Sequence, residues 1–569
     1  MSLRTRARTA AAAVAALAVA VLAGCASMPV SGAVNQGGDD VPRTGDFGQI
    51  AFGPTADADP EAIVRGFLRA TQAGPTSAAS FAVAREYLTK SAAETWSPSS
   101  RVLVTDVLPQ PVLADGSDPT SDRVVVHASA TVVASLDERG VFSEEQGGVE
   151  TTFELAREGG QWRISHLDDG LMVPSPTFGS TFHVTTLYFP TPDLRSWVPD
   201  VRWFPQTTWR TSAVQQLLAG PPEYLAGAAS AMLPVGTGLS ASVTEGPDGT
   251  FQVLLTDQAS EASGTARGVF AAQVRATLAE GRGAADVVLS DRNGPIVPTE
   301  VDVPELPHTP GRAVALQGGK LMNVTGRTLE QSELVVHLEG LDPQALAVSQ
   351  AGDTVVVRDG VGRLVRVTGQ SPSELLTGTW LLPPSIDRVG TVWTGDRGGP
   401  LVVVTPAGDR FALDVDWLEG RTVTSVRVSP EGARVAVVSS GEGGSTVQVA
   451  GIVRDARGVP TALASPVTVG ASVTGVEQAV WQEESVLALL SRDESGATSV
   501  YLAGVGGLHL AVGGLPRRIG GISDPTWLSA SVGSGDLLAI DGAGVLHVRQ
   551  TTALWPVVGT GVQLAAFAG

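Results

Sequence analysis

The residue in this chain with the clearest chemical potential is Cys25, its only cysteine. Cys25 ends the run Leu22-Ala23-Gly24-Cys25, which follows three arginines near the N-terminus and an apolar stretch over residues 10–23. A charged start, an apolar middle and small residues before a cleavage point are typical of a secretory signal peptide. We therefore expect a signal peptide over residues 1–24, cleavage between Gly24 and Cys25, and lipid attachment to Cys25.

The expected modification is a diacylglyceryl group on the Cys25 thiol and a further acyl chain, such as palmitate, on the amine that cleavage releases. More than one acyl chain gives stable membrane anchoring, whereas one chain gives only marginal binding. The mature protein would then be held at the extracytoplasmic face of the cell membrane. The apolar run is shorter than the roughly 20 residues of a membrane-spanning helix. Two alternatives stay open, namely an ordinary buried cysteine after a membrane-spanning start, and a signal peptide whose removal yields a soluble secreted protein.

The remaining residues that could perform chemistry do not form a recognisable catalytic set. The seven histidines lack the spacing of a helical or zinc-finger metal pair, and the chain has no H-E-x-x-H or G-x-S-x-G sequence. Two carboxylates can hydrolyse a glycoside, and the densest acidic segments are Asp115-Gly116-Ser117-Asp118 and Asp414-Val415-Asp416. We interpret the first as a turn and the second as a strand with both carboxylates on one face. The sequence predicts no enzyme, no metal and no cofactor beyond the lipid, with a carboxylate-dependent wall hydrolase as an alternative.

Three tryptophans recur every six residues, at Trp197, Trp203 and Trp209, beside several other aromatic residues. Such a group forms either the core of a small domain or an exposed face that binds sugar rings or a protein partner. We favour the core, and we keep the partner surface as a hypothesis that requires exposed side chains.

Composition describes an exported protein of several domains. The chain has 569 residues and 43% hydrophobic residues, so about three domains with their own cores are expected. One cysteine allows no intramolecular disulfide. A net charge of -20 disfavours nucleic acid as a partner.

The first part of the mature chain is predicted to be a tether followed by an α+β domain. Residues 25–58 contain many glycines and prolines and little apolar periodicity, as a flexible tether does. Asp59-Pro60 is a helix start. Further helical sequence near residues 81–88 and separate strands from residue 124 onward suggest a curved antiparallel sheet and a domain over residues 59–175. This order of elements resembles the nuclear-transport-factor-2-like (NTF2-like) class.

A second α+β domain is predicted over residues 180–305. Its strands and helices alternate, and one helix ends at Gly220-Pro221-Pro222. Four short segments of this domain resemble the GerMN module. They are Tyr188-Phe189-Pro190, Leu217-Leu218-Ala219-Gly220-Pro221, Leu233-Pro234-Val235-Gly236-Thr237 and Asn293-Gly294-Pro295-Ile296.

Residues 309–569 are rich in strands and glycine-containing turns, with an approximate repeat. Pairs such as Val348-Ser349, Val392-Trp393 and Val428-Ser429 each precede a turn and a second strand, at spacings typical of β-propeller blades. Five units are visible, and strands at residues 313–316 and 320–324 could close the ring with the C-terminal blade. The prediction is an all-β propeller of five or six blades, with a β-sandwich stack as the alternative.

Across essentially the whole chain, the order of the predicted parts resembles the actinobacterial LpqB lipoprotein family. These parts are the signal peptide, the lipidated cysteine, the tether, two α+β domains and the propeller. The resemblance implies an accessory protein of the Mtr two-component system, which contacts the extracytoplasmic sensor region of its histidine kinase and influences cell-wall homeostasis and division. It implies no catalytic residues. A scaffold that binds cell-wall polymer such as peptidoglycan is the alternative function.

Overall fold

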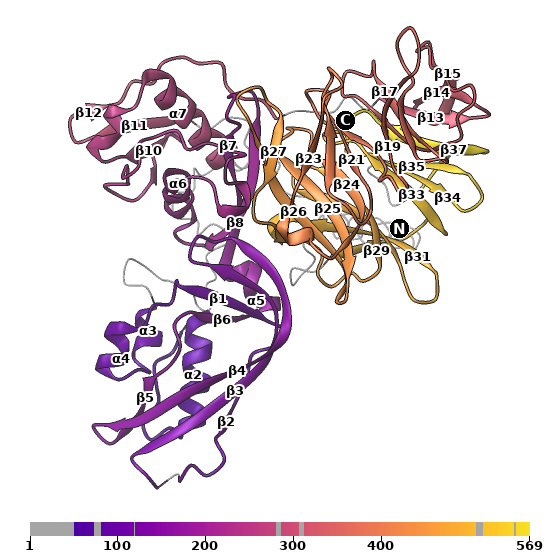
Figure 1. Ribbon diagram of the computed structural model, residues 1–569. Helices are drawn as coiled ribbons and strands as arrows, with labels where there is room; N and C mark the ends of the chain where they lie inside the picture. The colour runs from indigo at the N-terminus through magenta and orange to yellow at the C-terminus, as the bar shows by residue number, and fades with distance from the viewer. Residues whose placement is uncertain are drawn as a thin grey trace, which may run out of the picture. The chain divides into compact units, whose positions relative to one another are not determined.

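The structure is a computed structural model that describes residues 51–72, 81–118, 120–279, 286–306, 312–507, 516–550 and 554–569. The predicted signal peptide, Cys25 and nearly all of the predicted tether therefore lie outside the described residues. Within the described part, two helix-containing domains precede a long series of strands (Figure 1).

The first domain consists of a curved six-stranded sheet with helices packed against it (Figure 1). Its helices are α2 (Pro60–Gln72), α3 (Ala82–Arg85), α4 (Lys90–Thr95) and α5 (Ser175–Thr181). Its strands are β1 (Arg101–Thr105), β2 (Gln110–Leu113), β3 (Arg123–Asp137), β4 (Phe142–Glu158), β5 (Gln161–His166) and β6 (Leu171–Pro174). The strand order is β5-β4-β3-β1-β6, and β2 pairs with β3.

The predicted helix start at Asp59-Pro60 is confirmed. The Ala62 backbone N–H donates to the Asp59 carboxylate at 2.7 Å, and Pro60 is the first residue of α2. The apolar side of α2 is buried against the sheet. There Phe67 contacts Trp96 edge-to-face at a centroid distance of 5.2 Å and Phe153 at 6.1 Å, which fixes the helix on the sheet.

Two details of the predicted sheet are wrong. The segments expected as separate strands near residues 124–126 and 131–133 belong to one strand, β3, which pairs with β4 on both sides of a register shift between Val132 and Ala134. The sheet is also not purely antiparallel, since β1 and β6 run parallel. A long intervening connection makes this possible, because β6 returns to the sheet only after β2 to β5.

The second domain has a two-stranded hairpin and a separate four-stranded sheet. The hairpin is β7 (Phe182–Pro190) with β8 (Trp197–Pro205), and the sheet has the order β12-β11-β10-β9. The sheet strands are β9 (Thr244–Glu245), β10 (Phe251–Leu254), β11 (Val287–Asp291) and β12 (Gly294–Pro295), and the helices are α6 (Trp209–Ala219), η2 (Glu223–Leu225), η3 (Asp257–Glu261) and α7 (Gly264–Ala279). The predicted helix stop is confirmed, because α6 ends at Ala219 and Gly220 follows with a φ of 82°. Strand β8 was not expected from the sequence.

Among the residues that the structure describes, the C-terminal strands form six consecutive sheets. Blade 1 contains β37 (Val562–Phe567), β13 (Ala313–Gln317), β14 (Lys320–Thr325) and β15 (Thr328–Gln331). Blade 2 contains β16 (Pro343–Val348), β17 (Val355–Asp359), β18 (Arg363–Arg366) and β19 (Ser373–Thr377). Blade 3 contains β20 (Ser385–Ile386), β21 (Val392–Gly395), β22 (Leu401–Val404) and β23 (Arg410–Leu413).

The other three blades follow in chain order. Blade 4 contains β24 (Thr422–Val428), β25 (Arg434–Gly441), β26 (Gly444–Arg454), β27 (Pro460–Leu463) and β28 (Val467–Thr468). Blade 5 contains β29 (Val476–Glu483), β30 (Val486–Arg492), β31 (Thr498–Gly504) and β32 (Arg517–Ile519). Blade 6 contains β33 (Pro525–Ala530), β34 (Leu537–Asp541), β35 (Leu546–Arg549) and β36 (Val557–Gly559). The short helices η4 (Asp416–Leu418) and η5 (Val505–Gly507) lie in connections.

The six sheets close into a β-propeller. The first strands of successive blades are neighbours around a ring, from β37 through β16, β20, β24, β29 and β33 and back to β37. The C-terminal strand β37 pairs with β13, so the two strands predicted at residues 313–316 and 320–324 do close the ring. Of the predicted five or six blades, the propeller therefore has six, and the alternative of a β-sandwich stack is excluded. In blade 3, however, the pair Val392-Trp393 begins the second strand, because the two-residue strand β20 precedes it.

Six hairpin turns in the described part of the chain repeat the pattern Asp-x-x-Gly-x. In each turn the Asp carboxylate accepts the backbone N–H groups two and four residues later. The glycines have φ values between 73° and 86°, a conformation that disfavours residues with a side chain. These aspartates are Asp137, Asp359, Asp387, Asp455, Asp493 and Asp541. The pattern therefore sets the register of hairpins in two of the domains.

Candidate functional site

The predicted lipid-attachment residue Cys25 and the cleavage position at Gly24 lie outside the described residues. Lipidation at Cys25 therefore stays a prediction from the sequence. The structure does place the three predicted aromatic residues of the second domain and the contacts around them.

Trp197 and Trp209 are both only 4% exposed. Trp197 packs against α7 residues, and Trp209 begins α6 within the main core of the second domain. Burial of these two rings agrees with the core interpretation. On the folded protein, these two rings therefore offer a partner no accessible surface.

Trp203 occupies the point where the three folded domains meet. Its ring lies 4.8 Å from that of Phe178 and 6.2 Å from that of Phe142, two residues of the first domain. Its indole N–H donates to the Gly506 carbonyl of the propeller at 2.8 Å. Gly506 also has no room for a side chain, because a Cβ atom there would lie 2.9 Å from the Val201 carbonyl oxygen. Trp203 therefore joins the domains.

A buried arginine in blade 4 continues this junction. Arg434 is 0% exposed, and its Nε–H donates to the Glu431 carboxylate at 2.6 Å. Its other N–H groups donate to the Pro199 carbonyl of the second domain at 3.2 Å and to the Glu484 carbonyl of blade 5 at 2.6 Å. The guanidinium lies 4.7 Å from the Trp481 ring centroid. Burial alone would lower the pKa of Arg434, but the Glu431 carboxylate raises it, and the net effect is a raised pKa that keeps the guanidinium charged.

A second buried ion pair lies on β8. Asp200 and Arg202 are both 0% exposed and are joined by a hydrogen bond of 2.8 Å. Arg202 also donates to the Arg139 carbonyl of the first domain at 2.6 Å, and the Tyr224 hydroxyl donates to Asp200 at 2.8 Å. Burial and the neighbouring Asp200 carboxylate raise the pKa of Tyr224 far above its ordinary value. A buried ion pair is costly to disrupt, because removal of one partner leaves the other charge buried and uncompensated.

Two more charged contacts cross between domains at the surface of the junction. Asp193 of the second domain pairs with Arg388 of blade 3 at 2.6 Å. Glu144, on β4 of the first domain, accepts the backbone N–H groups of Gly470 at 2.7 Å and Ala471 at 2.6 Å. Burial raises the pKa of Glu144, against the opposing effect of these two hydrogen bonds.

No local sequence pattern indicates this junction, which joins residues hundreds of positions apart. One signal was available: Asp200 and Arg202 are charged residues within β8, whose other residues are apolar. Buried charges require partners. Nothing in the spacing of residues identifies those partners, because the contacts depend on how separate domains pack.

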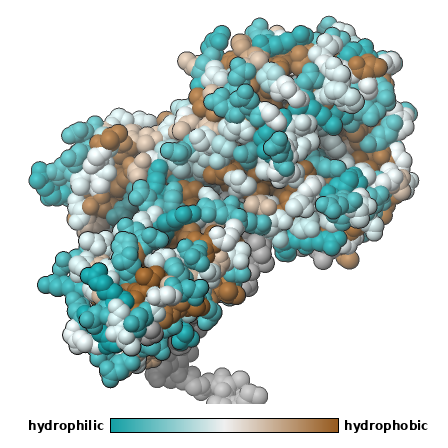
Figure 2. All heavy atoms as spheres, turned by 60° about the horizontal axis from the view of Figure 1, so that its bottom comes forward, coloured by the Kyte–Doolittle hydropathy of each residue, from teal (hydrophilic) through white to brown (hydrophobic). Residues whose placement is uncertain are grey.

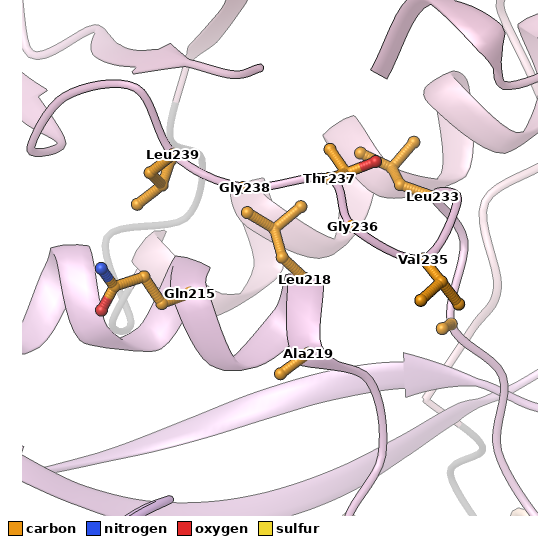
Figure 3. Close-up of a pocket in the computed structure, with 10 residues that line it drawn as sticks. Gln215, Leu218, Ala219, Leu233, Val235, Gly236, Thr237, Gly238 and Leu239 are labelled. Carbon is orange, nitrogen blue, oxygen red and sulfur yellow. The ribbon is translucent and has the colours of Figure 1, made fainter. Parts of the chain in front are cut away.

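A pocket of about 280 Å³ lies between two of the segments that resemble the GerMN module. Leu218 and Ala219 at the end of α6 form one side, and the loop from Leu233 to Leu239 forms the other. Leu218 points towards the part of this loop that carries Gly236 and Thr237 (Figure 3). The volume suits an apolar side chain more than a whole cofactor, because ligand sites usually measure roughly 300–1,000 Å³. The Thr237 hydroxyl already donates to the Pro234 carbonyl at 2.8 Å.

The structure places the two candidate carboxylate pairs in different local structures. The turn interpretation of the first pair is confirmed, because the Ser117 backbone N–H donates to the Ala114 carbonyl at 3.0 Å across Asp115-Gly116 and Gly116 has a φ of 81°. The strand interpretation of the second pair is wrong: β23 ends at Leu413, and Asp416 begins the short helix η4. Within the described ranges, no group of histidine, cysteine and carboxylate residues has the geometry of a metal site.

Figure 2 shows that hydrophilic residues cover most of the face in view, with hydrophobic residues in small separate patches. Among the described helices, none is long and apolar enough to cross a membrane.

Comparison with known proteins identifies all three folded regions. The model of the LpqB lipoprotein N-terminal domain matches residues 53–179, and the model of the LpqB β-propeller domain matches residues 319–565. The Germane model, described as sporulation and spore germination, matches residues 186–294. These ranges follow the three structural regions described above.

Several curated relatives share most of this chain. "Lipoprotein LpqB" of Bifidobacterium longum is 28% identical over 79% of this chain and 79% of its own length. The protein of the same name from Cutibacterium acnes is 26% identical over 94% of this chain and 90% of its own, and that from Streptomyces avermitilis is 27% identical over 88% and 89%. A solved chain of the nidogen–laminin complex covers 45% of this chain and 98% of its own, at 12% identity and a TM-score of 0.34, too distant to carry an argument. Because two LpqB domain models and full-length relatives match in the same order, this chain belongs to the LpqB lipoprotein family.

Proposed function

We propose that this protein is a lipid-anchored extracytoplasmic protein that binds the sensor region of the Mtr histidine kinase and modulates its signalling. The signal-like N-terminus with Cys25 and the lipoprotein names of the relatives support the anchoring. Through the kinase, the protein would influence cell-wall homeostasis and division.

A binding role suits the architecture better than catalysis. The matched models are those of lipoprotein, propeller and germination domains. The strongest polar clusters, around Arg434 and Asp200, are fully buried and internally paired, so they hold domains together and present no reactive group to a substrate.

The observation that carries the proposal is the buried junction. Arg434 joins blades 4 and 5 to the second domain, and Arg202 joins the second domain to the first. A partner that binds one domain therefore meets surfaces of the others in a fixed arrangement. Fixed surfaces can favour one conformation of a partner over another, which is what a modulator requires.

Anchoring would make modest affinity sufficient. A tether on the same membrane as the kinase raises the effective concentration to on the order of millimolar. The signalling equilibrium then shifts by the difference in affinity for the two kinase conformations, and by no more than that difference.

A direct binding experiment tests the proposal. The lipidated chain is reconstituted in nanodiscs, and binding of the purified kinase sensor region is measured by biolayer interferometry. We expect saturable binding, and the sensor region of an unrelated kinase is the control. Co-sedimentation with purified peptidoglycan is measured in parallel, because polymer binding without sensor binding would favour the scaffold alternative and reject the kinase role.

A further inference from the structure

One cluster on the propeller is built like a recognition site and has no role in the junction. Trp380 is 68% exposed, and Val361, in the turn between β17 and β18, is 75% exposed. The Gly378 backbone N–H donates to the Gly362 carbonyl at 2.9 Å, which ties the segment before Trp380 to the turn that carries Val361. Two large apolar side chains thus lie on neighbouring, mutually bonded loops.

Two arginines accompany these apolar side chains. Arg358 donates to the Leu381 carbonyl, next to Trp380, at 2.8 Å. Arg397 follows Asp396, and its backbone N–H donates to the Trp380 carbonyl at 3.2 Å. In the ranges that the structure describes, neither guanidinium forms an ion pair. The two hydrogen bonds place both arginines beside the Trp380-Leu381 segment. Burial lowers the pKa of Arg358, and the nearby Arg397 cation lowers it further.

The backbone around the cluster is fixed. Asp396 accepts the Trp380 backbone N–H at 2.7 Å, and Leu381 forms an isolated β-bridge with Asp396. At Gly362, with a φ of 82°, an added Cβ atom would lie 2.1 Å from the Gly378 carbonyl oxygen. The loops therefore present Trp380 and Arg397 in a defined arrangement, and little ordering would be needed on binding.

The cluster lies on the propeller face opposite to the turns that meet the second domain. Trp380 is in the connection from the last strand of blade 2 to the first strand of blade 3, and Arg397 is in the turn between β21 and β22. Arg388 and Glu484 lie in turns between the first and second strands of their blades. Antiparallel strands reverse direction at every turn, so these two sets of turns are at opposite faces.

We propose that Trp380, Val361, Arg358 and Arg397 form a docking surface for an acidic segment of a protein partner, one with a carboxylate beside an apolar side chain. Tryptophan and arginine are the residues that most often dominate protein interfaces. The ring and Val361 would cover the apolar side chain, and the guanidiniums would donate to the carboxylate. A glycan would need more free polar side chains around the ring, and the Asp396 carboxylate already accepts the Trp380 N–H.

This inference rests on the proposed function in one respect, because it assigns the acidic segment to the kinase sensor region. The nanodisc assay with the full lipidated chain tests it. Trp380→Ala and Arg397→Glu should each weaken sensor binding at least about tenfold. Arg457→Glu is the matched control, since Arg457 is an exposed arginine of blade 4 with 74% of its side chain accessible, and it should leave the affinity unchanged.

A second measurement locates the partner segment. A photo-crosslinking amino acid at position 361 should crosslink to an Asp- or Glu-containing segment of the sensor region, identified by mass spectrometry. If both Trp380→Ala and Arg397→Glu bind the sensor region as tightly as wild type, and their melting temperatures are unchanged, the docking surface is overturned. The proposed function is not. Absence of wild-type binding overturns both. Loss of peptidoglycan co-sedimentation in Trp380→Ala, with sensor binding retained, would make the cluster a polymer site and also reject the proposal.

Discussion

At the scale of single residues, the charged groups at the domain junction are the clearest determinants of stability. Arg434 is fully buried, and its removal would leave the Glu431 carboxylate buried without its cation. Breaking a buried pair in this way typically costs about 3–5 kcal/mol. We expect Arg434→Met to lower the free energy of unfolding by about that amount in urea titrations.

The matched control for this prediction is Arg457→Met. Arg457 pairs with Asp455 at the surface of the same blade, at 2.9 Å. Exposed pairs contribute little because solvent screens them, so the unfolding midpoint should not change. Equal midpoints for the two variants would contradict the assigned role of Arg434.

Residue types in the sequence indicated some of these roles and not others. The burial of Trp197 and Trp209 agrees with the expected core of a small domain. The three-domain contact of Trp203 could not be predicted, because it depends on Phe178 and Gly506, which lie in two other domains. Likewise, no local pattern indicated that Glu144 accepts backbone N–H groups more than 300 positions away.

At the scale of elements, the Asp-x-x-Gly-x turns determine hairpin register. Gly496 follows Asp493 in the turn between β30 and β31 and has a φ of 86° with open space around it. A side chain there meets no neighbour, so the cost of Gly496→Ala is backbone strain, about 1–2 kcal/mol. Thermal unfolding should show a lower melting temperature.

Gly398→Ala separates backbone strain from the mere addition of a methyl group. Gly398 also has open space but lacks a positive φ. Its substitution should leave the melting temperature unchanged or slightly raise it. A similar loss in both variants would mean that conformation at Gly496 is unimportant.

The same turn predicts a dependence on pH. The hydroxyl of Ser495, followed by the Ala497 backbone N–H, lowers the pKa of Asp493 below its ordinary value of 3.8. A carboxylate whose pKa is lower in the folded state than in the unfolded state stabilises the fold at pH values above the unfolded-state pKa. This stabilisation is lost as the pH falls through the folded-state pKa. The melting-temperature difference between wild type and Asp493→Asn should therefore be largest above about pH 5 and disappear in acid. A difference that is constant with pH would contradict the assignment.

Local elements were the part of the fold that the sequence predicted best. The start of α2, the end of α6 and the closing strands β13 and β14 follow from capping residues and apolar runs. Errors arose where length or pairing partner mattered. Strand β20 has two residues, too few to show a pattern, and the parallel pairing of β1 with β6 depends on the chain returning to the sheet.

At the scale of the whole molecule, the order of the domains is more informative than any motif within them. Single segments such as Leu233-Pro234-Val235-Gly236-Thr237 are short, and they describe one wall of a small pocket. The succession of an N-terminal domain, a germination-type module and a propeller matches the LpqB family over residues 53–179, 186–294 and 319–565. Trp203 and Arg434 join these domains, and the proposed function adds their anchoring at Cys25, which is a prediction from the sequence.

The most direct test of this account compares wild type with Cys25→Ser in cells that lack the native protein. Membrane fractionation, labelling with a palmitate analogue and the phosphorylation level of the Mtr response regulator are measured together. The account predicts that wild type is labelled, stays with the membrane and restores phosphorylation, whereas Cys25→Ser is unlabelled, leaves the membrane and fails to restore it. Normal response-regulator phosphorylation with the unlabelled, released variant would contradict the account.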